Sequence, residues 1–150
     1  MRTVIQRVLH ARVEVDRQVV GQIGPGLLLL VGFEPSDTAD DLQWLAAKVA
    51  SLRIFDDGQG AMNLALPDVG GQVLVVSQFT LHARTKKGSR PSFVGAAPAD
   101  VALTLYEEFV NTLERVLGQP VQTGSFGANM QVHLLNDGPV TIIIDTKNRE

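Results

Sequence analysis

Cysteine is absent from the 150-residue sequence, so neither a disulfide framework nor thiolate chemistry is expected. Long hydrophobic runs are missing as well, and the longest, residues 27–31, is far too short to cross a membrane. The first residues, Met-Arg-Thr-Val-Ile-Gln-Arg, lack the apolar core of a signal peptide. We therefore expect a cytoplasmic protein with no membrane partner.

An excess of positive charge is also lacking, because 13 Lys and Arg stand against 16 Asp and Glu and the net charge is -3. Broad duplex binding depends on many phosphate contacts, so DNA is not an expected partner. Binding of a short single-stranded nucleic-acid end remains compatible with this net charge. Four cationic side chains are bunched in one segment, where they form either a solvated loop or a phosphate contact: Arg84, Lys86, Lys87 and Arg90.

The usual signatures of metal and nucleophile sites are missing too. Asp56 and Asp57 are adjacent on a turn and lack the ligand spacing of a calcium loop, with no His or Glu cluster to support them. The sequence contains neither a Gly-x-Ser-x-Gly elbow nor a His-Glu-x-x-His motif. We expect no metal and no cofactor.

The hydrophobic share, 45%, is enough for a core, and the length predicts a single domain over residues 1–150. Alternating residues predict a strand over 3–15, followed by a hairpin turn near residues 16–18. Solid apolar runs predict strands at 27–31, buried on both faces, and at 73–76. Residues 121–144 finish the chain with further strands.

Two helices interrupt these strands. Thr38 and Asp41 have capping-box spacing, and an apolar stripe follows them. Pro98 fits the first turn of a second helix, which Gly118 ends. The stripe of the second helix is made by Val101, Leu105, Phe109, Leu113 and Val116. The order of elements predicts an α+β fold, with two helices against a mainly antiparallel sheet or partly closed barrel.

A turn signal lies within the last strands, at Asn136-Asp137-Gly138-Pro139-Val140-Thr141. Asn, Asp and Gly between strand-like runs predict a tight hairpin. Pro139 removes a backbone donor where the second strand of that hairpin would begin. It also makes Gly138–Pro139 a bond whose cis form costs only about 0.5–1 kcal/mol, against roughly 2.5–4 kcal/mol elsewhere.

Several stretches together resemble one family, the D-aminoacyl-tRNA deacylases. They are Met-Arg-Thr-Val-Ile-Gln-Arg-Val at the start, Ser-Gln-Phe-Thr at 77–80, Lys-Lys-Gly-Ser-Arg-Pro-Ser-Phe at 86–93, Thr-Gly-Ser-Phe-Gly-Ala-Asn-Met at 123–130, and Asn-Asp-Gly-Pro-Val-Thr at 136–141. The resemblance covers nearly the whole chain, up to about Asp145. The Ser-Gln-Phe-Thr and Asn-x-Gly-Pro-Val-Thr motifs are specific in combination.

The resemblance implies an editing hydrolase that removes D-amino acids, and glycine mischarged on alanine tRNA, from the 3′ end of tRNA. It implies a homodimer in which Gly138 and Pro139 form a cis dipeptide that enters the other subunit's site and blocks L-amino acids, braced by Arg7. The ester would lie beside Ser77, Gln78, Phe79 and Thr80. The terminal adenosine would stack on Phe126 and be lined by Met130, Ala96 and Ala97. Catalysis is assigned largely to the tRNA's 2′-hydroxyl, with main-chain oxyanion donors around Phe79 and Thr80.

Other interpretations of these residues stay open. Thr80 or Ser77 could be the nucleophile of an ordinary esterase with His82 as base, although a free hydroxyl is weak without an adjacent base. A non-catalytic module that binds tRNA ends is a third hypothesis. Phe79 and Phe126 also suit plain core packing, and Arg7 a surface charge. We assign no role to His82 or Asn129.

Overall fold

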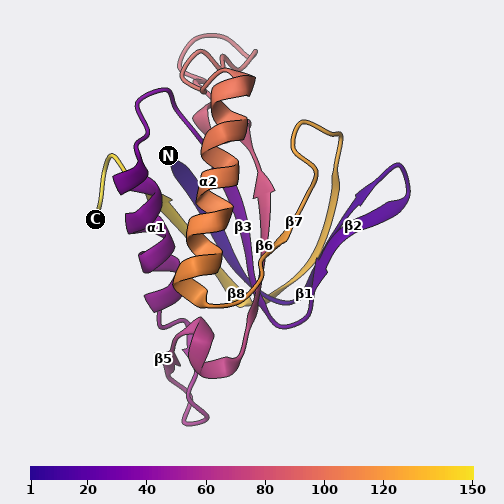
Figure 1. The fold of residues 1–150 in the computed structure, drawn as a ribbon, viewed down its shortest axis with the longest axis vertical. Coiled ribbons are helices and arrows are strands. Elements are labelled where there is room, and N and C mark those ends of the chain that lie inside the picture. The colour runs from indigo at the N-terminus through magenta and orange to yellow at the C-terminus, as the bar shows by residue number, and fades with distance from the viewer.

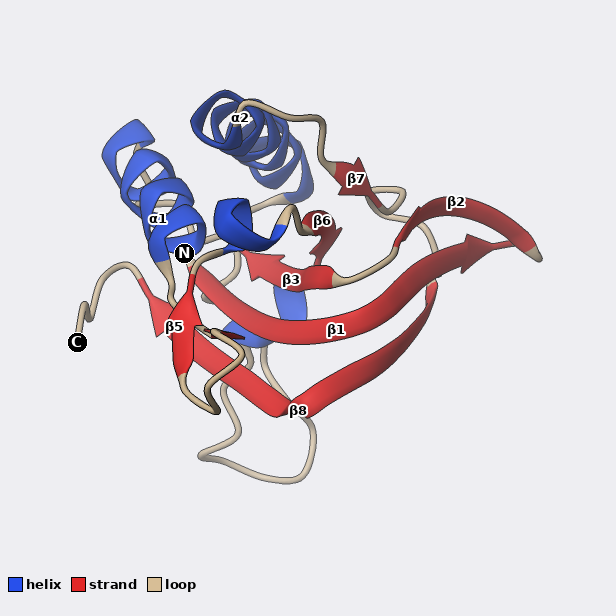
Figure 2. Ribbon diagram, turned by 90° about the horizontal axis from the view of Figure 1, so that it is seen from below, coloured by secondary structure: helices blue, strands red, loops and turns tan.

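The computed structural model describes all 150 residues, and two packed helices cover one side of a strongly curved sheet (Figures 1 and 2). The helices are α1 (Ala39–Ser51) and α2 (Ala99–Leu117), with short 3-10 helices η1 (Leu66–Val69) and η2 (Phe79–His82). The main sheet contains β1 (Arg2–Val15), β2 (Gln18–Ile23), β3 (Gly26–Gly32), β6 (Gln72–Ser77), β7 (Gln122–Thr123) and β8 (Gln131–Asp145). A separate small hairpin joins β4 (Phe55–Asp56) to β5 (Met62–Leu64).

β1 is the central strand of the sheet. It pairs antiparallel with β8 along nearly its whole length, and on its other side with β3 and then with β2. Asp16 and Arg17 both have positive φ, 49° and 65°, as the mirror-image turn of a tight hairpin requires. The predicted strand and the predicted turn near residues 16–18 are confirmed.

The sheet is mixed, so the prediction of a mainly antiparallel sheet is only partly right. β3, β6 and β7 run parallel to one another, and α1 lies on the long crossover from β3 to β6. β2 curls back towards β7, where a Cβ on Gly21 would lie 2.2 Å from the Thr123 carbonyl oxygen. The sheet is therefore a nearly closed barrel. A partly closed barrel was the second form predicted from the sequence.

β3 and β6 are buried on both faces. Alternate residues point to two cores, a cluster of 19 residues under the helices and a cluster of seven inside the barrel. Leu27 and Leu29 belong to the first cluster and Leu28 to the second. This explains the unbroken apolar run, and it confirms a strand buried on both faces.

The predicted hairpin at residues 136–141 is wrong. β8 is one strand, and both halves pair with β1: Val8 lies opposite Asn136 and Gln6 opposite Thr141. Residues 137–140 bulge out between these two pairs, opposite Arg7 alone. The Asn136 amide spans the bulge, since it accepts from the Val140 N–H at 3.2 Å and donates to the Thr141 hydroxyl at 3.0 Å. Local sequence marked the turn residues but could not reveal that both flanking strands share one partner.

Both helices begin and end at recognisable signals. Asp41 accepts from the Thr38 N–H at 3.0 Å, which confirms the capping box of α1. Pro98 is the N-cap of α2 rather than a residue of its first turn, and Gly118 ends α2 with φ 67°. The stripe of α2 is shifted from the expected one: Val101 is exposed, whereas Ala102 and Tyr106 join Phe109 and Leu113 in the core.

Neither α1 nor α2 has the length and hydrophobicity that a membrane-spanning helix needs.

Ion pairs at the start of α1 hold the two chain ends against it. The buried Met1 amine pairs with Asp37 and donates to the Thr146 hydroxyl, and Lys147 Nζ lies 2.6 Å from an Asp41 carboxylate oxygen. Burial opposes ionisation of Asp41, but hydrogen bonds from Lys147 and Thr38 hold its pKa well below the usual range. Trp44 packs locally, under the Arg149 guanidinium at 4.5 Å.

Candidate active site

The candidate active site is a largely apolar cavity of about 600 Å³ at the end of β3 and β6. These strands are parallel and adjacent, so both carboxyl ends open at one edge of the sheet, a common location of binding sites. The start of α2 and the segment before β8 complete the wall. Of its 17 lining residues, 13 are hydrophobic. The lining includes seven residues singled out from the sequence: Ser77, Gln78, Phe79, Ala96, Ala97, Phe126 and Met130.

The Ser-Gln-Phe-Thr stretch forms the turn from β6 into η2. The Gln78 N–H donates to the Val31 carbonyl at 2.7 Å, which extends the β3–β6 ladder past its last strand pair. A Cβ on Gly32 would lie 2.7 Å from the Gln78 carbonyl oxygen, so only glycine allows the two segments to pass this closely. Phe79 and Thr80 are the first residues of η2, where N–H groups have no carbonyl partner in their own helix.

No general base contacts the hydroxyl groups of this stretch. The Thr80 hydroxyl accepts from Gln78 Nε2 at 2.5 Å, and neither Ser77 nor Thr80 bonds to a histidine. Thr80 lies in η2 rather than in a strand and is not among the cavity-lining residues. His82 is buried outside this cavity and faces Glu34, with Nδ1 3.9 Å from its carboxylate.

Four aromatic side chains line the cavity: Phe33, Phe79, Phe93 and Phe126. Phe79 is 57% exposed and meets Phe93 edge-to-face, with ring centroids 5.1 Å apart. Phe126 tilts against Tyr106 at 5.6 Å. The Tyr106 hydroxyl donates to the Val75 carbonyl at 2.9 Å, and burial raises the pKa of Tyr106 to about 12, so it stays a neutral donor. The cavity thus presents aromatic surface at two places, as a flat ligand requires.

The second group of predicted residues lies elsewhere. Gly138 and Pro139 are exposed in the bulge of β8, with a cis peptide bond between them. Arg7 is buried beneath them: Nε donates to the Asp137 carbonyl at 3.2 Å and Nη1 to the Ile54 carbonyl at 2.6 Å. The Asp137 carboxylate also lies 3.2 Å from Arg7 Nε.

Strand register separates this bulge from the cavity of the same chain. Arg7 pairs with Leu27 at the start of β3, whereas the cavity begins at Val31 near its end. Four residues of strand span roughly 13 Å. Gly138 and Pro139 are not among the residues that line the cavity.

Sequence reasoning missed part of the lining. Phe93, Ala99, Ala102 and Val132 face the cavity, and of these only Phe93 lay in a stretch that had been singled out. No group of three or more His, Asp or Glu side chains converges as a metal site.

Comparisons with known proteins agree with this architecture. The family model described as D-Tyr-tRNA(Tyr) deacylase matches residues 4–145. Proteins named D-aminoacyl-tRNA deacylase are similar over the full length of both chains, with 57% identity in Parabacteroides distasonis and 55% in both Flavobacterium psychrophilum and Akkermansia muciniphila.

Two solved structures share the fold. That of a c-Myc DNA unwinding element binding protein has a TM-score of 0.90 and 36% identity, over 97% of this chain and 98% of that chain. That of a probable eukaryotic D-amino acid tRNA deacylase has a TM-score of 0.81 and 19% identity, over 95% and 97%. The family identified from the sequence motifs is confirmed: the chain belongs to the D-Tyr-tRNA(Tyr) deacylase family of enzymes.

Proposed function

We propose that this protein hydrolyses the ester of D-aminoacyl-tRNA, and of glycine mischarged on alanine tRNA, to release the free amino acid and tRNA. The cavity beside Phe79 carries the proposal. Its volume, about 600 Å³, is within the usual range for a small-molecule site. Its lining is mostly apolar with a few polar groups at one end, which suits an adenosine ester rather than a long polyanion. The names of the full-length relatives support the same activity.

The terminal adenosine occupies the side of the cavity with Phe126, Met130, Ala96 and Ala97. Stacking of the adenine on Phe126 contributes about 1–3 kcal/mol. The ester then lies over Ser77, Gln78 and Phe79, where the N–H groups of Phe79 and Thr80 donate to the oxyanion that forms when water adds to the carbonyl. One such donor accounts for about 3–4 kcal/mol of the barrier.

The vicinal 2′-hydroxyl of the substrate assists the attack. Water adds to the carbonyl carbon, the bond to the 3′-oxygen breaks, and that oxygen leaves with a proton. The protein holds the reacting groups in place, which alone removes several kcal/mol of barrier. No histidine lies beside Ser77 or Thr80, which supports a reaction in which the substrate's 2′-hydroxyl assists the attack and the protein positions the groups.

Selection against L-amino acids is assigned to Gly138 and Pro139 of a second subunit. Their carbonyl groups receive the substrate's α-amino group, and the dipeptide occupies the direction an L side chain would take. Support comes from the exposure of both residues and their separation from the cavity of their own chain. β8 is also an edge strand that pairs only with β1, and on one of its faces the Ile143 side chain is 76% exposed. The active form is accordingly a homodimer.

Paired L- and D-tyrosyl-tRNA provide the direct test. The protein should release D-tyrosine at least 100-fold faster than L-tyrosine, since a displacement of about 1 Å at the reacting centre already costs that much. Release is measured as acid-soluble labelled amino acid. Binding of tRNA without release of either enantiomer would instead indicate a module that binds tRNA ends.

An esterase with Thr80 or Ser77 as nucleophile makes a different prediction. Thr80→Ala should keep rates within about tenfold of the parent if the tRNA assists its own hydrolysis, because general-base and nucleophile losses cost far more. Conversely, D-tyrosyl-tRNA ending in 2′-deoxyadenosine should react at least 100-fold more slowly. A collapse of the Thr80→Ala rate, together with full activity on the deoxy substrate, would establish the esterase mechanism.

A further inference from the structure

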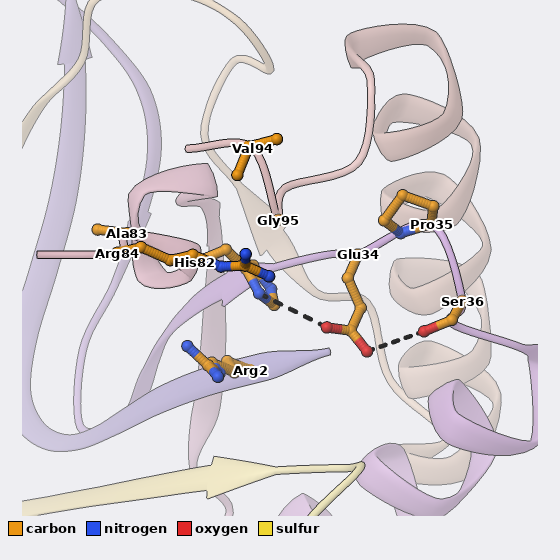
Figure 3. A pocket seen from close by; sticks show the side chains of 9 residues that line it. All are labelled: Arg2, Glu34, Pro35, Ser36, His82, Ala83, Arg84, Val94 and Gly95. Carbon is orange, nitrogen blue, oxygen red and sulfur yellow. Dashed lines mark hydrogen bonds and ion pairs between the residues drawn. The ribbon is translucent and has the colours of Figure 1, made fainter. Parts of the chain in front are cut away.

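A second hollow, of about 430 Å³, lies beside the first cavity and differs from it in chemistry. Its nine lining residues include only two hydrophobic ones; its charged side chains are Arg2, Glu34 and Arg84, and the His82 ring lies among them (Figure 3). The proposed reaction does not use it.

The two hollows share a wall. Phe33 lines the first and Glu34 the second, and residues 93–97 run from one to the other in the same way. Phe79 and His82, at the two ends of η2, also face opposite sides. A ligand that fills the first cavity therefore needs to extend by only a short distance to enter the second.

One cationic side chain at this hollow, Arg84, lacks a partner; Lys86, Lys87 and Arg90 follow it in the chain but do not line the hollow. Arg84, Lys86, Lys87 and Arg90 form no ion pair or side-chain hydrogen bond, whereas Arg2 pairs with Asp145 at 2.9 Å. The backbone of Arg84 is fixed by two hydrogen bonds with Ser92, of 2.8 and 3.0 Å. A Cβ on Gly95 would lie 3.5 Å from the Arg84 guanidinium, so this group lies beside the main chain of Gly95 at the hollow.

Glu34 places a carboxylate in the same hollow. The Ser36 hydroxyl donates to it at 2.9 Å, and His82 Nδ1 faces it at 3.9 Å (Figure 3). The other ring nitrogen of His82, Nε2, is buried without a hydrogen-bond partner. A simple anion would meet the repulsion of Glu34, and a neutral sugar would leave Arg84 unused. A ligand with both groups fits the hollow, because its anionic group can pair with Arg84 and its hydroxyl group can donate to Glu34.

We infer that this hollow binds the nucleotide on the 5′ side of the terminal adenosine. The Arg84 guanidinium pairs with the phosphodiester that joins the two nucleotides, because a guanidinium forms charge-assisted hydrogen bonds with phosphate. Glu34 accepts a hydrogen bond from the ribose 2′-hydroxyl, the only free hydroxyl of an internal ribonucleotide. This inference rests on the proposed function, because it extends the same substrate.

Two small substrates test the subsite: the D-tyrosyl ester of adenosine and the D-tyrosyl ester of the dinucleotide cytidylyl-adenosine. The parent enzyme should have a kcat/KM about tenfold higher for the dinucleotide ester, as expected of one charge-assisted contact. Arg84→Ala should bring that ratio close to one. Arg115→Ala removes an equal charge from the far end of α2 and should keep the parent ratio. Added salt should lower the ratio for the parent and not for Arg84→Ala.

Glu34→Ala separates the ribose contact from the phosphate contact, because it removes the acceptor altogether. The parent enzyme should prefer the dinucleotide ester whose cytidine has its 2′-hydroxyl over the 2′-deoxycytidine ester, and the variant should hydrolyse the two with the same kcat/KM. Equal kcat/KM values for the two esters in the parent enzyme, or a ratio that survives Arg84→Ala, would overturn the subsite and leave the proposed function intact. Failure to hydrolyse either ester or D-tyrosyl-tRNA would overturn both.

Discussion

Gly138→Ala should lower the release of D-tyrosine from D-tyrosyl-tRNA by about 100-fold, the scale that a 1 Å displacement near the reaction costs. Gly138 has φ 126°, a conformation that L side chains rarely adopt. An added Cβ would also lie 2.9 Å from Val140 Cγ2 and 3.1 Å from the Arg7 guanidinium. Both contacts are too close, and the bulge has to move to relieve them. If the main chain here holds the substrate's amino group, D-selectivity falls along with the rate.

Gly118→Ala is the matched control for this substitution. Gly118 also has positive φ, 67°, but a Cβ there would meet nothing within 4 Å. This variant should lose roughly 1–2 kcal/mol of stability through backbone strain alone and keep the parent rate and selectivity. Both variants are compared by thermal unfolding and by initial rates on the two enantiomers. A folded Gly138→Ala protein with parent rates on both would remove the bulge from the site.

The strands near the site could be predicted because each has one strong local signal. The residues of β3 are apolar at every position of the run 27–31, and the structure buries both of its faces. The direction of pairing was not available from the same signal, because an apolar run fits either a parallel or an antiparallel neighbour. The α1 crossover decides it, and crossover connections are a property of the whole chain.

The bulge of β8 was only partly predictable from the sequence. Asn136, Asp137 and Gly138, which predict a turn in the sequence, belong to β8 in the structure, and of the three only Gly138 has positive φ. Whether such residues reverse a strand or only interrupt it depends on the partner. β1 is 14 residues long and accepts both halves of β8, so the chain continues in one direction. Local turn chemistry specified the break, and tertiary pairing specified its form.

The candidate site was predictable where residues cluster in a motif and not where they converge from several segments. Residues 77–79 are consecutive and begin at the last residue of β6, so the end of one strand places all three in the cavity. Glu34 and Arg84 are 50 positions apart and meet only because η2 and the end of β3 lie side by side. The sequence indicated Arg84 only as one member of a cationic cluster, either a solvated loop or a phosphate contact, and Glu34 belongs to no motif.

Arg7→Ala should destabilise the protein by about 2–3 kcal/mol and reduce D-selectivity. The side chain is buried and joins two segments, through the Ile54 carbonyl before β4 and the Asp137 carbonyl in the bulge. Truncation leaves the Ile54 carbonyl without its donor. It also releases Asp137, which precedes Gly138, so the bulge is held to β1 only by the strand pairs at its two ends. The carboxylates of Asp137 and Asp56 are 39% and 65% exposed and regain water, which keeps the loss below that of a fully buried pair.

Arg7→Lys distinguishes bracing of the bulge from general stability. A lysine ammonium can reach one of the two carbonyls but lacks the planar fork that bonds to both at once. It should recover part of the stability and little of the selectivity, because the Ile54 bond, at 2.6 Å, is shorter than the 3.2 Å bond to Asp137 and is the one retained. Arg12→Ala is the control on the same strand: its pair with Glu14 is partly exposed, so it should cost less than about 1 kcal/mol. Selectivity that falls in proportion to stability across all three variants would mean that Arg7 supports the fold and has no separate part in orienting Gly138 and Pro139.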